Sequence, residues 1–135
     1  MNTQILDLHE FVDLYSTQPL IELIELSFKS NLYPVGTPWT STKIQDELKQ
    51  GECLTLLREG QALGLILYRH VKNTPLDITW LCTHPDYRNQ GIMKELLVKL
   101  INDNPKQDIW LEVHPENNPA RALYESMGFK QSAIR

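Results

Sequence analysis

The sequence lacks several features that would mark a specialised class of protein. No run of Lys or Arg occurs in its 135 residues, and the formal net charge is −4. Strong sequence-independent binding to nucleic acid is therefore disfavoured, because it needs several cationic contacts to phosphates. Met1–Ile5 carries no basic segment and no long apolar run, so we expect no signal peptide. The longest apolar runs, such as Leu63–Tyr68, are strand length, so we expect no contact with a membrane.

Cysteine is also scarce. The two cysteines, Cys53 and Cys82, do not have the spacing of a metal site. Two free thiols fit a reducing cytoplasm better than a disulfide scaffold, so we expect a cytoplasmic protein without a metal. Cys82 has no base close to it in the sequence that would activate its thiol, and a packed strand cysteine is the better interpretation.

The sequence does contain the ordinary composition of a single globular domain. Its apolar fraction is 41% and its charged fraction is 22%. A chain of this length is large enough for a hydrophobic core, and we treat residues 1–135 as one domain.

Apolar periodicity and turn residues predict alternating strands and helices. Helix Glu10–Lys29 should be interrupted at Pro19. Ser41 or Thr42 should cap a short helix that runs to Gln50 and is ended by Gly51, and Thr42 with Gln45 resembles a capping box. The strands are expected over Gln4–Leu8, Cys53–Arg58, Ala62–His70, Leu76–Thr83 and Asp108–His114. A further helix should start at Gln90, with apolar residues as far as Ile101, and the last helix should cover Pro119–Met127. Phe129–Ile134 has room for one last short strand.

This order predicts an α/β fold with a central mixed β-sheet flanked by helices. Glu59-Gly60-Gln61 is short enough to join two antiparallel strands. The strand–helix–strand unit over Leu76–His114 should be parallel, because a helix connects its strands.

The segment Arg88–Met93 lies where a strand gives way to a helix. The first turn of a helix offers free backbone amides to a phosphate, Gly91 permits a close approach, and Arg88 can add a charged contact. An ordinary turn with Gly91 for tight packing is the alternative. A Walker-type nucleotide site is disfavoured, because no Lys-Ser or Lys-Thr follows the glycine.

Two residues near the C-terminus can transfer protons. Glu112 lies in the predicted strand and is either a solvent-facing carboxylate or a general base for an amine. Tyr124 lies on the last helix and is either a core tyrosine or an acid that protonates a leaving thiolate. Asn117 reads as a cap or turn residue, and His84 and His114, each before a proline, read as loop residues rather than zinc ligands.

Together, Arg88-x-x-Gly91 and Asn117-x-x-Ala120-x-x-Leu123-Tyr124-x-x-x-Gly128-Phe129 resemble the GNAT superfamily of acetyl-CoA-dependent N-acetyltransferases. Pro38-Trp39 and Leu111-Glu112-Val113 are similar to the ribosomal-protein alanine N-acetyltransferases within it. The resemblance implies Glu112 as base and Tyr124 as acid. It implies that acetyl-CoA lies along the residues Leu81, Cys82, Thr83, Arg88, Asn89, Gln90, Gly91, Ile92, Met93 and Asn117, beside a strand that splays from Ile109–Val113.

The sequence departs from the family pattern in two places. Met93 stands where the family has Gly or Ala, and its side chain either crowds the cofactor or turns into the core. The chain has room for only one short strand after the last helix, where GNAT folds usually have two. A partner that covers the exposed sheet edge, an open acceptor groove and an incomplete domain are the alternatives, and the first of them predicts a homodimer.

The resemblance therefore implies an enzyme that transfers an acetyl group directly to a primary amine. A protein N-terminus is the leading acceptor, with entry over Asn31–Thr40. The rival enzyme acts on a small amine such as a polyamine, an amino acid or an aminoglycoside. The rival from another class is a non-catalytic module that binds acetyl-CoA.

Overall fold

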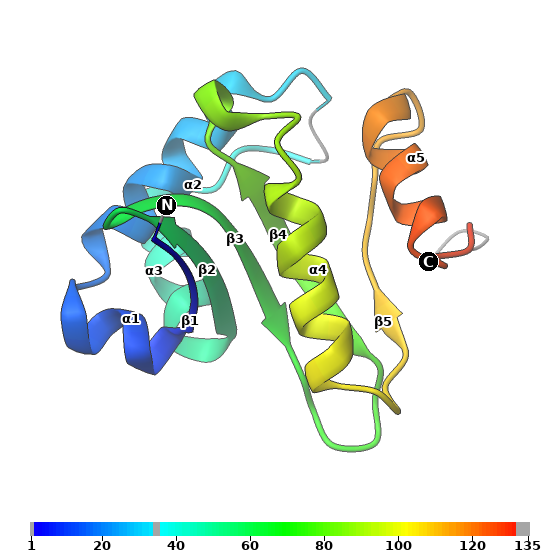
Figure 1. Cartoon of the computed structure of the whole chain (residues 1–135), viewed down its shortest axis with the longest axis horizontal. Helices are drawn as coiled ribbons and strands as arrows, with labels where there is room; N and C mark the ends of the chain where they lie inside the picture. The colour runs from blue at the N-terminus through cyan, green and yellow to red at the C-terminus, as the bar shows by residue number, and fades with distance from the viewer. Residues whose placement is uncertain (1, 34–35, 132–135) are drawn as a thin grey trace.

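The computed structural model describes residues 2–33 and 36–131. They form a mixed sheet with helices on both faces, in the α/β architecture that the sequence predicts (Figure 1). The strands are β1 (Thr3–Asp7), β2 (Glu52–Arg58), β3 (Gln61–Arg69), β4 (Leu76–Thr83) and β5 (Ile109–Trp110). The helices are α1 (Leu8–Leu14), α2 (Gln18–Ser30), α3 (Ser41–Gln50), α4 (Ile92–Asp103) and α5 (Asn118–Ser126), with a short 3₁₀ turn at Pro85–Tyr87.

The sheet follows the chain order from β1 to β5. Its first four strands are antiparallel neighbours, and β5 is parallel to β4, so both the predicted hairpin and the predicted parallel unit are confirmed. Each pair of hydrogen-bonded strands in the sheet is therefore also consecutive along the chain.

Two apolar clusters cover the two faces of this sheet. One contains Phe11, Leu20 and Ile44 and buries α1, α2 and α3 against the strands. The other contains Ile92, Leu96 and Tyr124 and buries α4 and α5. Figure 1 shows α4 in front of the sheet, with α5 beyond it at the edge that carries β5. The molecule is therefore built in three layers.

Strand β4 contains a β-bulge, which determines the face of the sheet to which each of its side chains points. Leu67 pairs with Trp80 while Tyr68 pairs with Ile78, so Thr79 is an extra residue in β4. Before the bulge, Ile78 packs in the α4 cluster; after it, Trp80 and Cys82 pack on the α2 side and Leu81 on the α4 side. An extra residue reverses the alternation of faces and bends the strand.

The strand predicted over Asp108–His114 is the largest correction. Only Ile109 and Trp110 pair with β4, opposite Leu76 and Asp77. Pairing stops next to the bulge at Thr79, because the bent strand diverges from its neighbour there. Residues 111–114 therefore leave the sheet.

Several helix boundaries also differ from those predicted. Pro19 lies in the first turn of α2, which confirms the break. The cap of α3 is Thr40, whose Oγ1 accepts from the Lys43 amide at 3.2 Å, so the predicted caps at Ser41 or Thr42 are wrong by one or two residues. Gly51 ends α3 as predicted. The last predicted strand is absent at residues 129–131, and positions 132–134 lie outside the described residues.

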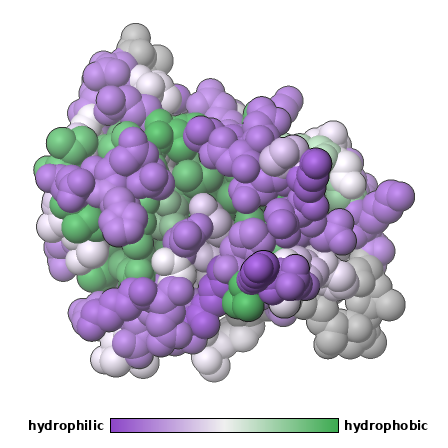
Figure 2. All heavy atoms as spheres, turned by 90° about the horizontal axis from the view of Figure 1, so that it is seen from below, coloured by the Kyte–Doolittle hydropathy of each residue, from purple (hydrophilic) through white to green (hydrophobic). Residues whose placement is uncertain are grey.

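The surface is mainly polar. Figure 2 shows polar side chains over most of one face, with an apolar area on the left, the side on which Figure 1 places α1 and α3. Val12 and Leu14 of α1 are among the large apolar side chains that are exposed. Within residues 2–33 and 36–131, no helix has the length and apolar character needed to cross a bilayer.

Candidate active site

A cavity of about 890 Å³ opens where β4 and β5 diverge. Its walls are the bulged part of β4, the start of α4, residues 111–114, α5 and the segment after α2. The residues singled out from the sequence that line it are Leu81, Cys82, Thr83, Arg88, Asn89, Gly91, Ile92, Met93, Glu112, Asn117 and Tyr124. Residues from both sequence motifs therefore face one space.

The start of α4 presents backbone amides to this cavity. The helix begins at Ile92, two residues later than predicted, because Asn89 and Gly91 both have positive φ angles, +63° and +77°. Gly91 is the N-cap residue and supplies no side chain to the first amides, whereas Asp7, Thr40 and Asn117 cap their helices. Among the described residues, apart from Gly91 itself and its two chain neighbours, no atom lies within 4 Å of the position that a Cβ on Gly91 would occupy. The first turn is therefore open to an anion, which its dipole favours.

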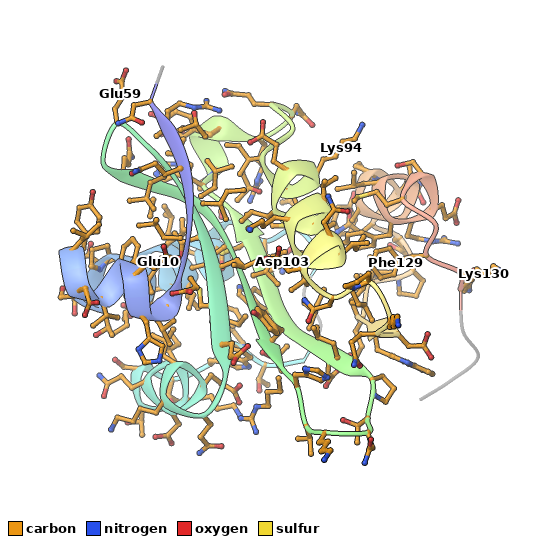
Figure 3. The ribbon with its side chains drawn as sticks, turned by 60° about the horizontal axis from the view of Figure 1, so that its bottom comes forward. Glu10, Glu59, Lys94, Asp103, Phe129 and Lys130 are labelled. Carbon is orange, nitrogen blue, oxygen red and sulfur yellow. The ribbon has the colours of Figure 1, made fainter. Side chains whose placement is uncertain are left out.

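The side chains around this turn take three different positions. Met93 is 9% exposed and packs in the α4 cluster, so its side chain turns into the core. Arg88 lines the cavity, and its Nη2 donates to the carbonyl oxygen and the hydroxyl of Ser30 at the end of α2. Gln90 accepts from Arg58 and does not line the cavity, the one residue of the predicted set that lies outside it. Figure 3 shows Lys94 at this end of α4, with Asp103 at the other.

Tyr124 and Glu112 line the cavity from different elements. Tyr124 is 6% exposed and its ring packs edge-on against Phe129 at 6.0 Å. Burial raises the pKa of Tyr124 to about 12, so the phenol keeps its proton at neutral pH. Glu112 is exposed on the segment that leaves the sheet after β5. The arrangement brings a protonated acid and a carboxylate to one cavity, which is what proton transfer in two directions requires.

Cys82 also lines the cavity but is a poor nucleophile. It is 7% exposed, and burial raises the pKa of its thiol to about 12. The reactive thiolate is therefore almost absent at neutral pH. Its position on the α2 side of β4 agrees with the interpretation of a packed strand cysteine.

Asn117 and the two histidines organise turns. The Oδ1 of Asn117 accepts from the Ala120 amide at 3.3 Å and caps α5, as its position before the helix predicted. The Nδ1 atoms of His84 and His114 accept from the amides of Asp86 and Glu116, both at 3.1 Å. In the described part of the chain, His, Cys, Asp and Glu side chains nowhere form a group of three or more that could hold a metal ion.

Sequence reasoning found the α2 side of the cavity only in part. Tyr33 and Trp39 lie in the Asn31–Thr40 segment over which the acceptor was predicted to enter, whereas Ser27, Lys43, Glu47 and Trp80 were missed. Trp39 lies 5.7 Å from Trp80 between ring centroids, and the Lys43 ammonium lies 5.6 Å from the Trp39 ring. A tryptophan in an alternating strand reads as ordinary packing, and no local pattern reveals the bulge that aims it.

The family model that matches this chain describes acetyltransferases, and two related bacterial proteins are acetyltransferases as well. The sequence model described as Acetyltransferase (GNAT) family matches residues 17–129. The [ribosomal protein bS18]-alanine N-acetyltransferase of Haemophilus influenzae is 36% identical over 129 residues, which are 86% of this chain and 84% of that protein. The enzyme of the same name from Escherichia coli strain K12 is 43% identical over 58 residues, 41% of this chain. That match spans only 39% of the Escherichia coli protein.

A solved structure shares the fold. The crystal structure of the ribosomal-protein-S18-alanine N-acetyltransferase from Escherichia coli superposes with a TM-score of 0.79. The match covers 99% of this chain and 81% of that chain, at 22% sequence identity. At this identity the likeness establishes the architecture alone.

Proposed function

Because this chain belongs to the acetyltransferase (GNAT) family, we propose that it transfers an acetyl group from acetyl-CoA directly to a primary amine at the N-terminus of a protein. The observation that carries the proposal is the meeting of three features in one cavity. They are the uncapped first turn of α4, the buried phenol of Tyr124 and the carboxylate of Glu112.

The chain's own residues fit the cosubstrate. The pyrophosphate binds the backbone amides of Gly91, Ile92 and Met93, because that turn has no side-chain cap and Gly91 leaves the approach open. The amide of Gln90, which the family resemblance also implied, belongs to a residue outside the cavity. Arg88 and Asn89 border the same turn. The pantetheine arm runs beside Leu81, Cys82 and Thr83, which line the cavity where β5 has left the sheet, with Asn117 on the opposite side.

Acetyl-CoA supplies an acetyl group activated as a thioester. Glu112 takes the proton from the acceptor amine, directly or through a water, so that the nitrogen forms its bond to the acetyl carbon. Backbone amides along the diverging β4 stabilise the charge that develops on the acetyl oxygen. Tyr124 gives its proton to the sulfur as the carbon–sulfur bond breaks, and the products are the N-acetylated amine and CoA. Holding both reactants in one cavity supplies proximity.

The acceptor enters on the α2 side. The thioester and phosphate positions occupy the part of the cavity bounded by α4 and α5, which leaves Tyr33, Trp39 and Trp80 as the walls on the other side. The relatives named above are alanine N-acetyltransferases of a ribosomal protein, and this supports a protein N-terminus as the acceptor here.

The test has two stages. Calorimetric titration of acetyl-CoA should show binding to one site per chain. Wild-type protein should then acetylate a peptide with N-terminal alanine, detected by mass spectrometry, while the same peptide with a blocked N-terminus remains unchanged. Turnover of small amines without turnover of the peptide would assign the acceptor to the small-molecule class. Binding without any turnover would leave a non-catalytic module.

A further inference from the structure

Three aromatic rings form a wall on the α2 side of the cavity. Phe28 and Trp80 stack with ring centroids 4.3 Å apart, and Trp39 lies 5.7 Å from each of them. Trp39 and Trp80 line the cavity, whereas Phe28 backs them from α2. We call Phe28, Trp39 and Trp80 the aromatic wall.

Trp80 is held in one orientation. Its indole N–H donates to the hydroxyl of Ser27 at 3.0 Å, and that hydroxyl donates to the carbonyl of Ile24 at 2.6 Å. Ser27 is only 4% exposed, so the anchor lies inside the core. Because packed interiors yield little, a ring fixed by a hydrogen bond and a stacked neighbour cannot swing aside for a bulky ligand.

The bulge brings this ring next to the reaction. Trp80 follows Thr79, the extra residue in β4, and precedes Leu81 and Cys82, beside which the thioester arm is proposed to run. Without the extra residue, Trp80 would share a face with Ile78 and lie under α4. A substituent on the carbon that carries the acceptor amine therefore approaches the indole from the cavity.

We propose that Trp80 is a specificity-determining residue, which limits the substituent beside the acceptor amine to a small one such as the methyl group of alanine. This inference rests on the proposed function, because it requires an amine to meet acetyl-CoA in this cavity. A longer side chain would meet a rigid apolar ring, and a charged one would lose hydration against it.

The experiment measures binding, so that it does not depend on turnover. The probes are two conjugates in which an acetyl bridge joins the sulfur of CoA to the N-terminus of a peptide. The peptides differ only in their first residue, alanine in one and leucine in the other. Calorimetry gives the Kd of each conjugate and of CoA alone, and the readout is the ratio of the two conjugate Kd values.

Wild-type protein should bind the alanine conjugate at least about tenfold more tightly, since small changes at a packed apolar wall discriminate by about 10- to 200-fold. In Trp80→Ala the ratio should fall below about threefold, mainly because the leucine conjugate binds more tightly. Trp80→Phe keeps an aromatic ring but loses the N–H that donates to Ser27, so its ratio should lie between those of wild type and Trp80→Ala. Trp110→Ala removes a tryptophan that is 36% exposed and does not line the cavity, and should leave the ratio unchanged.

Ser27→Ala provides a second variant that retains the ring but releases its anchor, in case Trp80→Ala does not fold. Its ratio should lie between those of wild type and an unselective site. An unchanged ratio in Trp80→Ala or, failing that variant, in Ser27→Ala overturns the role of Trp80 while CoA still binds. Failure of CoA alone to bind wild-type protein overturns the proposed function and this inference with it.

Discussion

Gly64 is the position where one added methyl group should disturb both stability and cofactor binding. It lies in β3, opposite Thr83, directly beneath α4. A Cβ at Gly64 would lie 2.7 Å from Cγ2 of Ile92, 3.3 Å from Cδ1 of Leu96 and 3.3 Å from the carbonyl oxygen of Cys82. Carbon atoms pack best at about 3.5–4.0 Å, so the first contact is short by about 0.8 Å.

The short contact falls on the turn that is proposed to bind the pyrophosphate. Ile92 is the first residue of α4 and is 2% exposed, so its methyl group has no room to withdraw. Gly64→Ala should therefore lift the start of α4 from the sheet. Overpacking of this kind costs about 1–3 kcal/mol, although alanine regains about 0.5–1 kcal/mol through its lower backbone entropy.

Thermal unfolding followed by circular dichroism measures this cost. The 2.7 Å contact places the overpacking cost in the upper part of its range, about 2–3 kcal/mol, so the net loss is about 1–2.5 kcal/mol. For a domain of this size, each kcal/mol shifts Tm by about 3–4 °C, so Gly64→Ala should unfold about 3–10 °C below wild type. Acetyl-CoA should also bind more weakly by calorimetry. In an Ile92→Ala background the clashing methyl group is absent, and the same substitution at Gly64 should cost little. An unshifted Tm, or an equal cost in both backgrounds, would refute the packing argument.

Three further predictions concern the titratable groups. Tyr124→Phe should lower kcat by about 10²–10⁴-fold while acetyl-CoA binding by calorimetry is preserved, and normal turnover would exclude Tyr124 as the acid. Glu47→Gln should destabilise the protein by roughly 1–3 kcal/mol at pH 7 in urea unfolding, because Glu47 is 4% exposed and its Oε1 accepts from Lys43 at 2.7 Å and Arg69 at 2.8 Å. Burial raises the pKa of the Glu47 carboxyl, but the hydrogen bonds from Lys43 and Arg69 outweigh this effect, so the pKa in the folded protein is lowered. The stability that Glu47 contributes is therefore complete above the usual carboxyl pKa and is lost as the pH falls through the lower pKa of the folded state. Equal unfolding curves for wild type and Glu47→Gln at pH 7 would contradict this prediction. Cys53 and Cys82 should react with iodoacetamide at pH 8 only after unfolding, because burial raises the pKa of each thiol to about 12. Rapid labelling of the native protein would contradict this prediction.

The fold was predictable wherever a local signal sufficed. Pro19 cannot donate a backbone hydrogen bond, and the helix breaks before it. The apolar runs of β2 and β3, with the tight turn between them, produce the predicted hairpin. The cap of α3 was misplaced because Thr40, Ser41 and Thr42 are all capping residues, and only the backbone geometry selects Thr40.

The site was predictable only in part, for a related reason. The residues between Arg88 and Met93 are contiguous, so their shared turn could be inferred from the sequence. The wall around Trp80 depends on a bulge, and a bulge is a property of two paired strands rather than of one. The same bulge ends the pairing of β5 after Trp110, which the alternation in Ile109–Val113 did not reveal.

One extra residue in β4 thus accounts for the two features on which the proposed chemistry depends. It bends the strand, so that β5 diverges and a cavity opens between them. It also reverses the alternation, so that Leu81 packs toward α4, whose first turn is proposed to bind phosphate, while Trp80 and Cys82 pack toward α2, on the side proposed for the acceptor. A regular β4 would place Trp80 on the cofactor side and continue its pairing with β5. Deleting Thr79 should therefore abolish acetyl-CoA binding even if the sheet still forms, a more specific outcome than general instability.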